Sequence, residues 1–361
     1  MINADSVSII STSTTDLDVS ADGTIGGAIA VGIMKPVANA TNRNSAGIGA
    51  GTVITTEQNF TLRADSNNDV YAEATGTTGG LVAVVEATTT LTVDDQTSAE
   101  IGAGATVDAK GDVTVEAVMT TEADAEAEAD AAGLGVGADA TANTTFLGST
   151  TTTIRGTLIG ENVTVQARVA EIDIDAVSDT EADAGVPITA AISTTTSDST
   201  ATVTVVAGAL IRGEASVEIL AVQQNLDTRS NATSDANGLG GDSDAEAPTT
   251  QTTVSNVTGQ SGAQVSTRDL LVQAEAPFAP TFSANATKEG FVLIDTGEES
   301  VNPTLSLTRT IVFNSMITML GPRSPEVEIG PNGEVVRKIN ATLNGDTLQE
   351  GDTVPGTQVV V

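Results

Sequence analysis

The sequence predicts an all-β protein, a β-solenoid built from about five to six repeats of roughly 53 residues. Three observations support this fold class: short alternating apolar segments recur at a fixed spacing, glycine-rich breaks recur with them, and large side chains are scarce. The 361 residues include 35 Gly, six Phe, one Tyr and no Trp. Apolar side chains this small suit a thin interior better than a globular core.

The recurring segment alternates apolar and polar residues, which is typical of a β-strand with one buried face. Its copies begin at residues 7, 60, 113, 163, 217 and 270, so successive copies lie 53, 53, 50, 54 and 53 residues apart. A unit of this size cannot bury its apolar side chains alone, so neighbouring units are expected to stack. We expect each unit to supply two or three rungs of roughly 18 to 27 residues.

The segment 122–131 shows the alternation most clearly, with Ala at every second position and carboxylates between. Ala and Glu also favour helices. A helix would, however, spread these acids around its surface, and Thr, Val and Gly on both flanks favour a strand. The Gly-rich breaks at 23–27, 76–80, 133–137 and 238–241 are interpreted as turns or tight corners. A string of small β-sandwich domains is the alternative architecture, but it needs more large apolar residues.

A boundary is predicted near residue 276, which divides the solenoid repeats of 1–275 from a β-rich module or solenoid interruption at 276–361. Seven of the ten Pro and four of the six Phe lie beyond it, and the repeat spacing is not apparent there. Within this second region, a Pro-Asn-Gly turn at 331–333 predicts a hairpin near 326–339.

Composition excludes several classes of function. The chain has no Cys and no His, so thiolate chemistry, Cys/His metal sites and histidine base catalysis are ruled out. The 14 Lys and Arg against 48 Asp and Glu give a net charge of −34, which repels nucleic acid and anionic membranes. No apolar run is long enough to span a membrane as a helix. An acidic, Thr-rich chain of this kind is expected outside the cell or at its surface.

The repeats, with their Ile-Gly-Ala-Gly segments at 48–51 and 101–104 and their Val-x-Val-x-Ala segments at 113–117 and 163–167, resemble the repetitive regions of giant secreted bacterial β-solenoid surface proteins. These are the filamentous-haemagglutinin-like adhesins. The resemblance covers roughly residues 1–275. It implies export, an elongated shape and a role in adhesion, matrix or filament formation, and it implies no catalytic residues.

Calcium is the candidate cofactor, because carboxylate oxygens are abundant and extracellular Ca²⁺ is millimolar. The candidate metal ligands are Asp94, Asp95, Asp242, Asp244 and Glu246. The opposing interpretation is a solvated anionic surface that keeps the protein soluble. Two sequons, at Asn59 and Asn162, precede core strands and are candidate glycosylation sites at exposed corners.

The favoured function is a non-catalytic structural and adhesive segment of an extracellular cell-surface fibre. Its expected partners are copies of itself or neighbouring repeats of a longer chain, and surface glycans are further candidates. Val359, Val360 and Val361 are the candidate residues for end-to-end self-association, because an unpaired apolar strand can join another subunit. The alternative function is a Ca²⁺-dependent glycan-binding adhesin module. A carbohydrate-active enzyme or an ice-binding Thr array is less favoured, because no carboxylate pair stands out and strand propensity explains the Thr content.

Overall fold

The computed structural model describes residues 1–276, 281–291 and 295–320, together with the backbone of five short strands further along the chain. The described residues form strands and turns and contain no helix that could cross a membrane. The longer strands are β2 (Val7–Gly26), β3 (Ile29–Met34), β4 (Val37–Ile48), β6 (Phe60–Ile101), β8 (Val113–Ile154), β9 (Thr157–Val205), β10 (Leu210–Gln223), β11 (Leu226–Asn237), β12 (Asp242–Gly259), β14 (Asp269–Glu275), β15 (Thr281–Glu289) and β16 (Glu299–Phe313). The shorter ones are β1 (Ile2–Ala4), β5 (Val53–Thr56), β7 (Thr106–Ala109), β13 (Gln264–Thr267), β17 (Met316–Met319), β18 (Glu328–Ile329), β19 (Val335–Val336), β20 (Asn340–Leu343), β21 (Asp346–Leu348) and β22 (Gln358–Val360).

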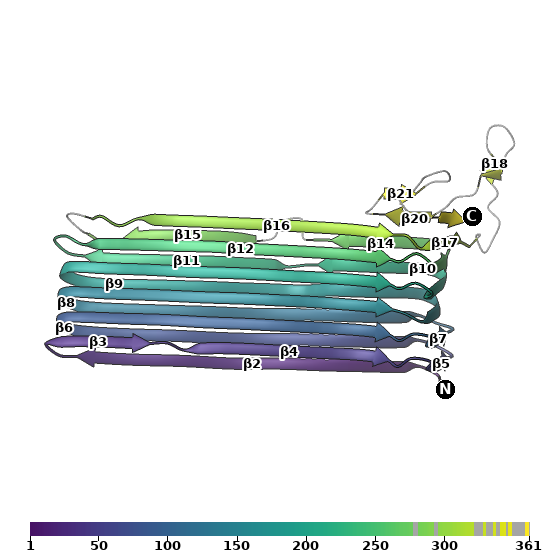
Figure 1. The fold of residues 1–361 in the computed structure, drawn as a ribbon, viewed down its shortest axis with the longest axis horizontal. Coiled ribbons are helices and arrows are strands. Elements are labelled where there is room, and N and C mark those ends of the chain that lie inside the picture. The colour runs from purple at the N-terminus through teal and green to yellow at the C-terminus, as the bar shows by residue number, and fades with distance from the viewer. Residues whose placement is uncertain are drawn as a thin grey trace.

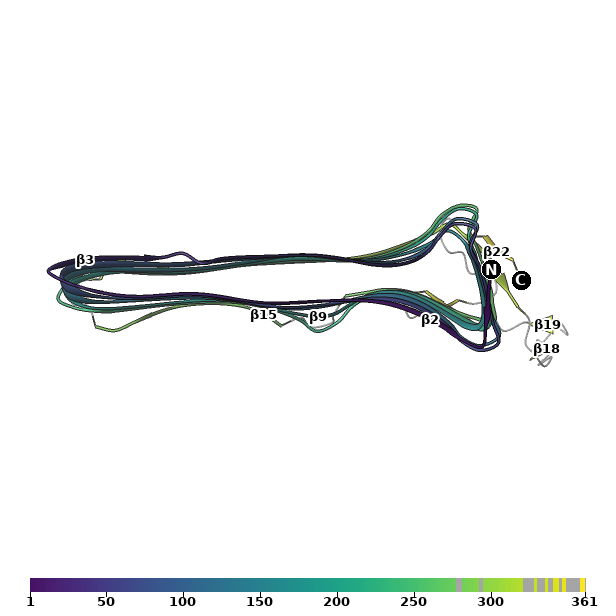
Figure 2. The same ribbon diagram turned by 90° about the horizontal axis from the view of Figure 1, so that it is seen from below.

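The chain winds as a flat β-solenoid, as the sequence predicts. In each coil it runs along one broad sheet, reverses at a tight distal turn and returns along a second broad sheet. A short strand, such as β5 or β7, then closes the wide end and leads to the next coil (Figure 2). The strands of successive coils pair in parallel and lie one above another (Figure 1).

The register of this stack follows the sequence repeat. Val7 pairs with Phe60, Phe60 with Val113, Val113 with Val163, Val163 with Val217 and Val217 with Leu270. Each repeat is therefore one complete coil. The expectation of two or three rungs per repeat is wrong, because the alternating segments continue as strands of about 20 residues instead of breaking at intermediate corners. At about 3.3 Å per residue such strands span ~66 Å, whereas each added coil lengthens the stack by only about 4.8 Å. The described chain is accordingly a slab, wider than its stack is tall (Figure 1).

The interior between the two broad sheets is graded in side-chain size. Near the wide end it holds the largest buried side chains, among them Phe60, Leu62 and Ile101. Along the narrow arm, the part of each coil that leads to the distal turn, the inward positions are mostly Ala, Ser and Thr. Ala72 and Ala74 are examples. Small side chains let the two sheets approach closely, which explains the scarcity of large residues in the sequence. Strand β8 (Val113–Ile154) contains the segment 122–131, so the strand interpretation of that segment is confirmed.

The stack continues past the boundary predicted near residue 276. Asp227 pairs with Thr281, Val257 with Ile311 and Val265 with Ile317, so β15, β16 and β17 extend the same ladders. The repeat is obscured in this stretch because charged and proline residues occupy positions that are apolar in earlier coils. Further along the chain, β18 and β19 form an antiparallel pair at the place where the sequence predicts a hairpin.

In the second and third coils the distal turn has glycine at one stacked position, which the fourth coil fills with Ala184. A Cβ atom added to Gly133 would lie 2.0 Å from the carbonyl oxygen of Gly80, and one added to Gly80 would lie 2.1 Å from that of Gly27. Two residues along, a Cβ atom on Gly135 would meet no atom within 4 Å. The first position is closed to side chains by the backbone of the coil below, and the second is open.

Replacing Gly133 by Ala is expected to destabilise the protein by about 1–3 kcal/mol, because the backbone of the coil below must shift. The matched variant Gly135→Ala should leave stability unchanged or slightly higher, since it adds no contact and reduces the freedom of the unfolded chain. Urea unfolding followed by circular dichroism measures both. Equal effects of the two variants would contradict the close stacking of the distal turns.

Candidate functional site

The most distinctive surface is the outer face of the first broad sheet, which we call the acidic face. Alternation in β6, β8, β9 and β11 sends Ala inward and carboxylates outward, and parallel stacking then places acid above acid. Asp124 stacks on Asp175, and Glu128 on Asp179. The acidic face consists of Asp69, Glu73, Glu122, Asp124, Glu126, Glu128, Asp130, Asp173, Asp175, Asp179, Glu181, Asp227 and Asp235.

Crowding and partial burial on this face favour protonated carboxyls. Burial, followed by the charges of Asp175 and Glu122, raises the pKa of Asp124 from 3.8 to about 7. Burial and the charges of Glu128 and Glu181 raise the pKa of Asp130 to about 6. The pKa values of Glu128, Asp173, Asp175, Asp179 and Asp235 are raised too, with burial as the largest cause in each.

Two side chains relieve part of this repulsion. The Arg229 guanidinium lies 3.2 Å from the Asp175 carboxylate and also bonds to Asp227, so one cation serves two coils. The Tyr71 hydroxyl donates a hydrogen bond of 2.9 Å to Glu126 in the next coil. Arg229 also lies 4.0 Å from Asp173, and Glu73 and Asp235 accept hydrogen bonds from Thr75 and Asn237. These contacts leave the acids of the face far more numerous than its bases, so the surface can attract cations over a broad area.

The structure does not join Asp94 and Asp95 into a metal site. Because neighbouring residues of a strand point to opposite sides, Asp94 faces outward, where its carboxylate lies 2.5 Å from the Arg43 guanidinium. Asp95 faces the interior and is fully buried. The pair is thus separated by the sheet itself.

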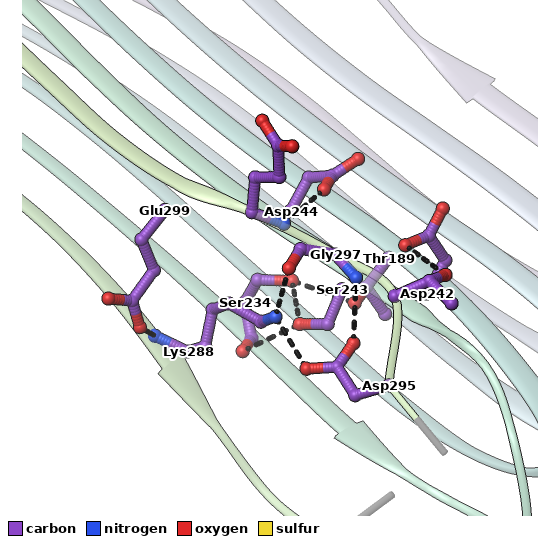
Figure 3. A network of polar contacts seen from close by, with 11 residues as sticks. Thr189, Ser234, Asp242, Ser243, Asp244, Lys288, Asp295, Gly297 and Glu299 are labelled. Carbon is purple, nitrogen blue, oxygen red and sulfur yellow. Dashed lines mark hydrogen bonds and ion pairs between the residues drawn. The ribbon is translucent and has the colours of Figure 1, made fainter.

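The second candidate metal group, Asp242, Asp244 and Glu246, lies on one strand with its members at alternate, outward positions. Figure 3 shows Asp242 and Asp244 of this group. Asp242 accepts a hydrogen bond of 3.0 Å from the Thr296 hydroxyl, and Asp244 accepts one of 2.8 Å from the backbone N–H of Glu298. These two acids therefore anchor the segment that leads into β16. Throughout the described residues, no three acidic side chains converge closely enough to hold a metal ion.

A lysine supports the same segment. The Lys288 ammonium lies 2.5 Å from the Asp295 carboxylate and donates a hydrogen bond of 2.8 Å to the carbonyl oxygen of Gly297 (Figure 3). Hydrogen bonding to Lys288, with a further bond from the backbone N–H of Gly297, lowers the pKa of Asp295. This network is structural, because each charged group already has a partner within the chain.

Sequence reasoning missed a buried polar network around Asp95. Its carboxylate accepts hydrogen bonds from the Ser66 hydroxyl at 2.5 Å, the Asn68 amide at 2.7 Å and the Thr97 hydroxyl at 3.1 Å. The Asn42 amide of the coil below donates to Ser66 at 2.7 Å. Burial raises the pKa of Asp95, and these donors oppose the rise. The network links both broad sheets and two coils, so it fixes their relative register.

The two predicted glycosylation sites lie at the corner between the short strand and the first broad sheet. Asn59 is exposed, and its side-chain oxygen accepts a hydrogen bond of 2.9 Å from the backbone N–H of Asp112. Asn162 is half-buried, and its amide donates a hydrogen bond of 2.8 Å to the Asp112 carboxylate. A glycan on the Asn162 amide nitrogen would therefore disrupt a contact between coils. The contact between Asn59 and Asp112 uses the Asn59 side-chain oxygen and not its amide nitrogen.

The C-terminal candidates for self-association lie at the end of the stack. Val359 and Val360 belong to β22, which pairs in parallel with β17 through Ile317 and Thr318. Val361 lies outside the described residues. The two described valines thus extend the ladder of short strands by one step.

A depression of about 250 Å³ lies at the wide end, lined by Asp108, Lys110, Glu161 and Glu214 among others. The Lys110 ammonium forms an ion pair with Glu57, outside this lining. Comparisons of the chain with protein-family models, with curated proteins and with solved structures find no match.

Stability should fall as the pH rises from about 5 to about 8. A carboxyl whose pKa is raised on folding binds its proton more tightly in the folded chain, so deprotonation between the unfolded value of 3.8 and the folded value of about 7 for Asp124 costs stability. Thermal unfolding across this range measures the slope. Asp124→Asn should flatten it, whereas Asp198→Asn on the opposite broad face should not. A midpoint that rises with pH, or equal effects of both variants, would contradict repulsion on the acidic face.

The Asp95 network predicts different effects for two substitutions of one residue. Asp95→Asn keeps an acceptor for Ser66 and Asn68 and a donor toward Thr97, and it removes a buried charge, so stability should be maintained or increased. Asp95→Ala leaves the three donors without their acceptor and should cost roughly 1–3 kcal/mol or more. Urea unfolding distinguishes them. If Asn were as destabilising as Ala, the carboxylate charge itself would be required.

Proposed function

We propose that this chain is a non-catalytic structural and adhesive segment of an extracellular cell-surface fibre. The observation that carries the proposal is the parallel pairing of successive coils from β2 to β16, with one repeat per coil and only local register shifts near Met119 and Gly213. Such a stack can be lengthened by any further coil of the same outline. A fibre follows from adding coils, and no separate assembly domain is required.

The hydrogen-bond ladders between strands support the proposed mechanical role. Each long strand is bonded to its neighbours along about 20 residues in each broad sheet, so bending the stack strains many bonds at once. The thin, closely packed interior adds cross-sheet contacts, such as the hydrogen bond of 2.5 Å from the Thr89 hydroxyl to the carbonyl oxygen of Glu126. These features support a stiff element that transmits force rather than a hinge.

The acidic face supports the proposed adhesive role. Carboxylates repeat about every 4.8 Å from coil to coil and about every 6.6 Å along each strand. A surface of this kind makes many weak contacts through bridging cations, and repetition converts them into avidity. The alternative, a Ca²⁺-dependent glycan-binding module, requires a site that prefers calcium over magnesium. The broad, open acid array favours cations without such selectivity.

Electron microscopy of the purified chain tests the proposal. In millimolar calcium or magnesium, flat particles should associate into longer or bundled assemblies, and a chelator should dissolve or loosen them, because divalent ions screen and bridge the acidic faces. The two cations should act alike. Monodisperse particles that ignore both cations and chelator would contradict the fibre, and a response to calcium alone would favour the glycan-binding alternative.

A further inference from the structure

Large exposed apolar side chains gather at the distal turns, at the end of the slab opposite the short closing strands (Figure 2). Ten of them lie there in the first five coils, with exposed fractions between 40% and 77%. We call this surface the distal strip. It consists of Ile29, Val31, Ile33, Leu81, Val82, Val84, Leu134, Val186, Ile188 and Leu239.

Parallel stacking arranges the distal strip in columns that run along the stack. One column contains Ile29, Val82, Gly135 and Val186, and the next contains Val31, Val84, Gly137 and Ile188. The distal turns lie one above another along the side of the slab (Figure 1). A coil added above or below would therefore lengthen the distal strip and leave it uncovered.

The distal strip is nearly free of charge, although the net charge of the chain is −34. The segments that contain the turns have no acidic or basic residue; they are 23–34, 74–85, 131–138, 184–197 and 236–241. On the first broad sheet, Asp130 and Asp183 point outward a few residues before the turn. On the second broad sheet, the margin of the strip holds Asp139 and the ion pair of Glu86 with Lys35, at 2.5 Å. Two acidic chains therefore approach each other with least repulsion through the strip on the second broad sheet.

The exposed area is large enough for a stable protein interface. The ten residues expose roughly 1,000 Å² in total, whereas monomers rarely expose apolar patches above a few hundred Å². A specific interface takes about 800 Å² from each partner. The distal strip thus has the size of an interface, unlike the scattered apolar residues of an ordinary surface.

A second copy of the chain fits this surface best. Its own distal strip has coils at the same spacing of about 4.8 Å, so apolar residues meet coil for coil. A two-fold axis parallel to the stack, between the second broad sheets of two copies, overlaps the distal ends and points them in opposite directions. The two acidic faces then lie on the outside of the pair, separated by both slabs. An anionic lipid surface would instead meet the outward carboxylates beside the turn.

We infer that the distal strip is a self-association surface, to which a second copy of this chain binds through its own distal strip. The contact is isologous, so it closes on itself as a pair of slabs. This association goes beyond the proposed fibre and does not depend on it, because cation bridging uses the first broad sheet and this contact uses the second. Coils added to the stack would lengthen the contact.

Cysteine crosslinking in EDTA tests the pairing, because the chain has no Cys of its own and EDTA prevents cation bridging. Facing sheets lie about 10 Å apart, so a bismaleimide that spans about 10 Å should join V84C chains into a covalent dimer. The matched control is T92C, which lies on the same strand and the same outward face, further from the turn. Its two cysteines would be about 50 Å apart in the pair and should not be joined.

Charge substitutions test the same contact by sedimentation equilibrium, in EDTA and about 0.15 M salt. Ile188→Lys should weaken dimerisation by about tenfold or more, because it places an ammonium in the apolar contact. Thr196→Lys adds the same charge on the same strand and outward face, beyond the overlap, and should stay within about threefold of the native dissociation constant. Both side chains point away from the core, so circular dichroism should show native strand content for both variants.

A native chain that stays monomeric at tens of micromolar, or equal crosslinking of V84C and T92C, would overturn the pairing. A monomer that binds phosphatidylcholine vesicles, and loses this binding with Ile188→Lys, would also overturn it and assign the strip to lipid. The fibre proposal is tested separately, because it requires divalent cations. Dimers in EDTA without larger assemblies in calcium would support this contact and contradict the fibre.

Discussion

The structure depends on one constraint: nearly all strand residues of a coil are stacked on residues about 53 positions away in the sequence, and the register shifts only locally, near Met119 and Gly213. Parallel ladders impose this, because a shift of one residue would move each inward side chain to the outside. The choice at one position is therefore repeated along the axis. Small inward residues give a thin interior along the narrow arm of each coil. Glycine recurs at one distal-turn position in Gly80 and Gly133 before Ala184 takes that position, and outward Asp69, Glu122 and Asp173 stack in one column.

The same constraint makes the acidic face destabilising for the folded chain. Stacked carboxylates repel, and this repulsion adds to burial, the larger cause, in raising the pKa values of Asp124 and Asp130. A surface selected only for stability would alternate acids with bases between coils, as occurs where Arg229 stacks on Asp175 and Arg63 on Glu116. The retention of acid upon acid over several coils is what supports a functional role for this face in binding cations.

Sequence reasoning could predict the fold class and the register, because the period-two alternation and its recurrence at residue 60, 113 and 163 are visible without coordinates. It could not predict how many times the chain reverses within a repeat. Glycine-rich breaks mark one reversal in each coil, yet nothing local to the segments between them shows that the strands stay straight for 20 residues. The pairing partners of a strand lie too far away in the sequence to leave a local signal.

The candidate sites show where such reasoning fails and where it can be improved. Adjacency in the sequence suggests Asp94 and Asp95 as a pair, although alternation places adjacent residues on opposite sides of a sheet. Asp95 falls on the same alternate positions as Leu91 and Val93, and this pattern in the sequence indicates a buried carboxylate. Ser66 and Asn68, whose hydrogen bonds stabilise the buried Asp95 carboxylate, lie on the other sheet. Which residues of the two sheets face each other is not visible in the sequence.

The central claim, one coil per repeat, is tested most directly by a distance between spin labels on cysteines introduced at Thr61 and Thr88. In a coil of 53 residues these outward positions lie on opposite broad sheets, offset by about 12 residues along the strands, so double electron–electron resonance should give a separation of about 40 Å. In a coil half that length they would be neighbours in adjacent rungs. A distance below about 15 Å would contradict the single-coil repeat and the slab shape that follows from it.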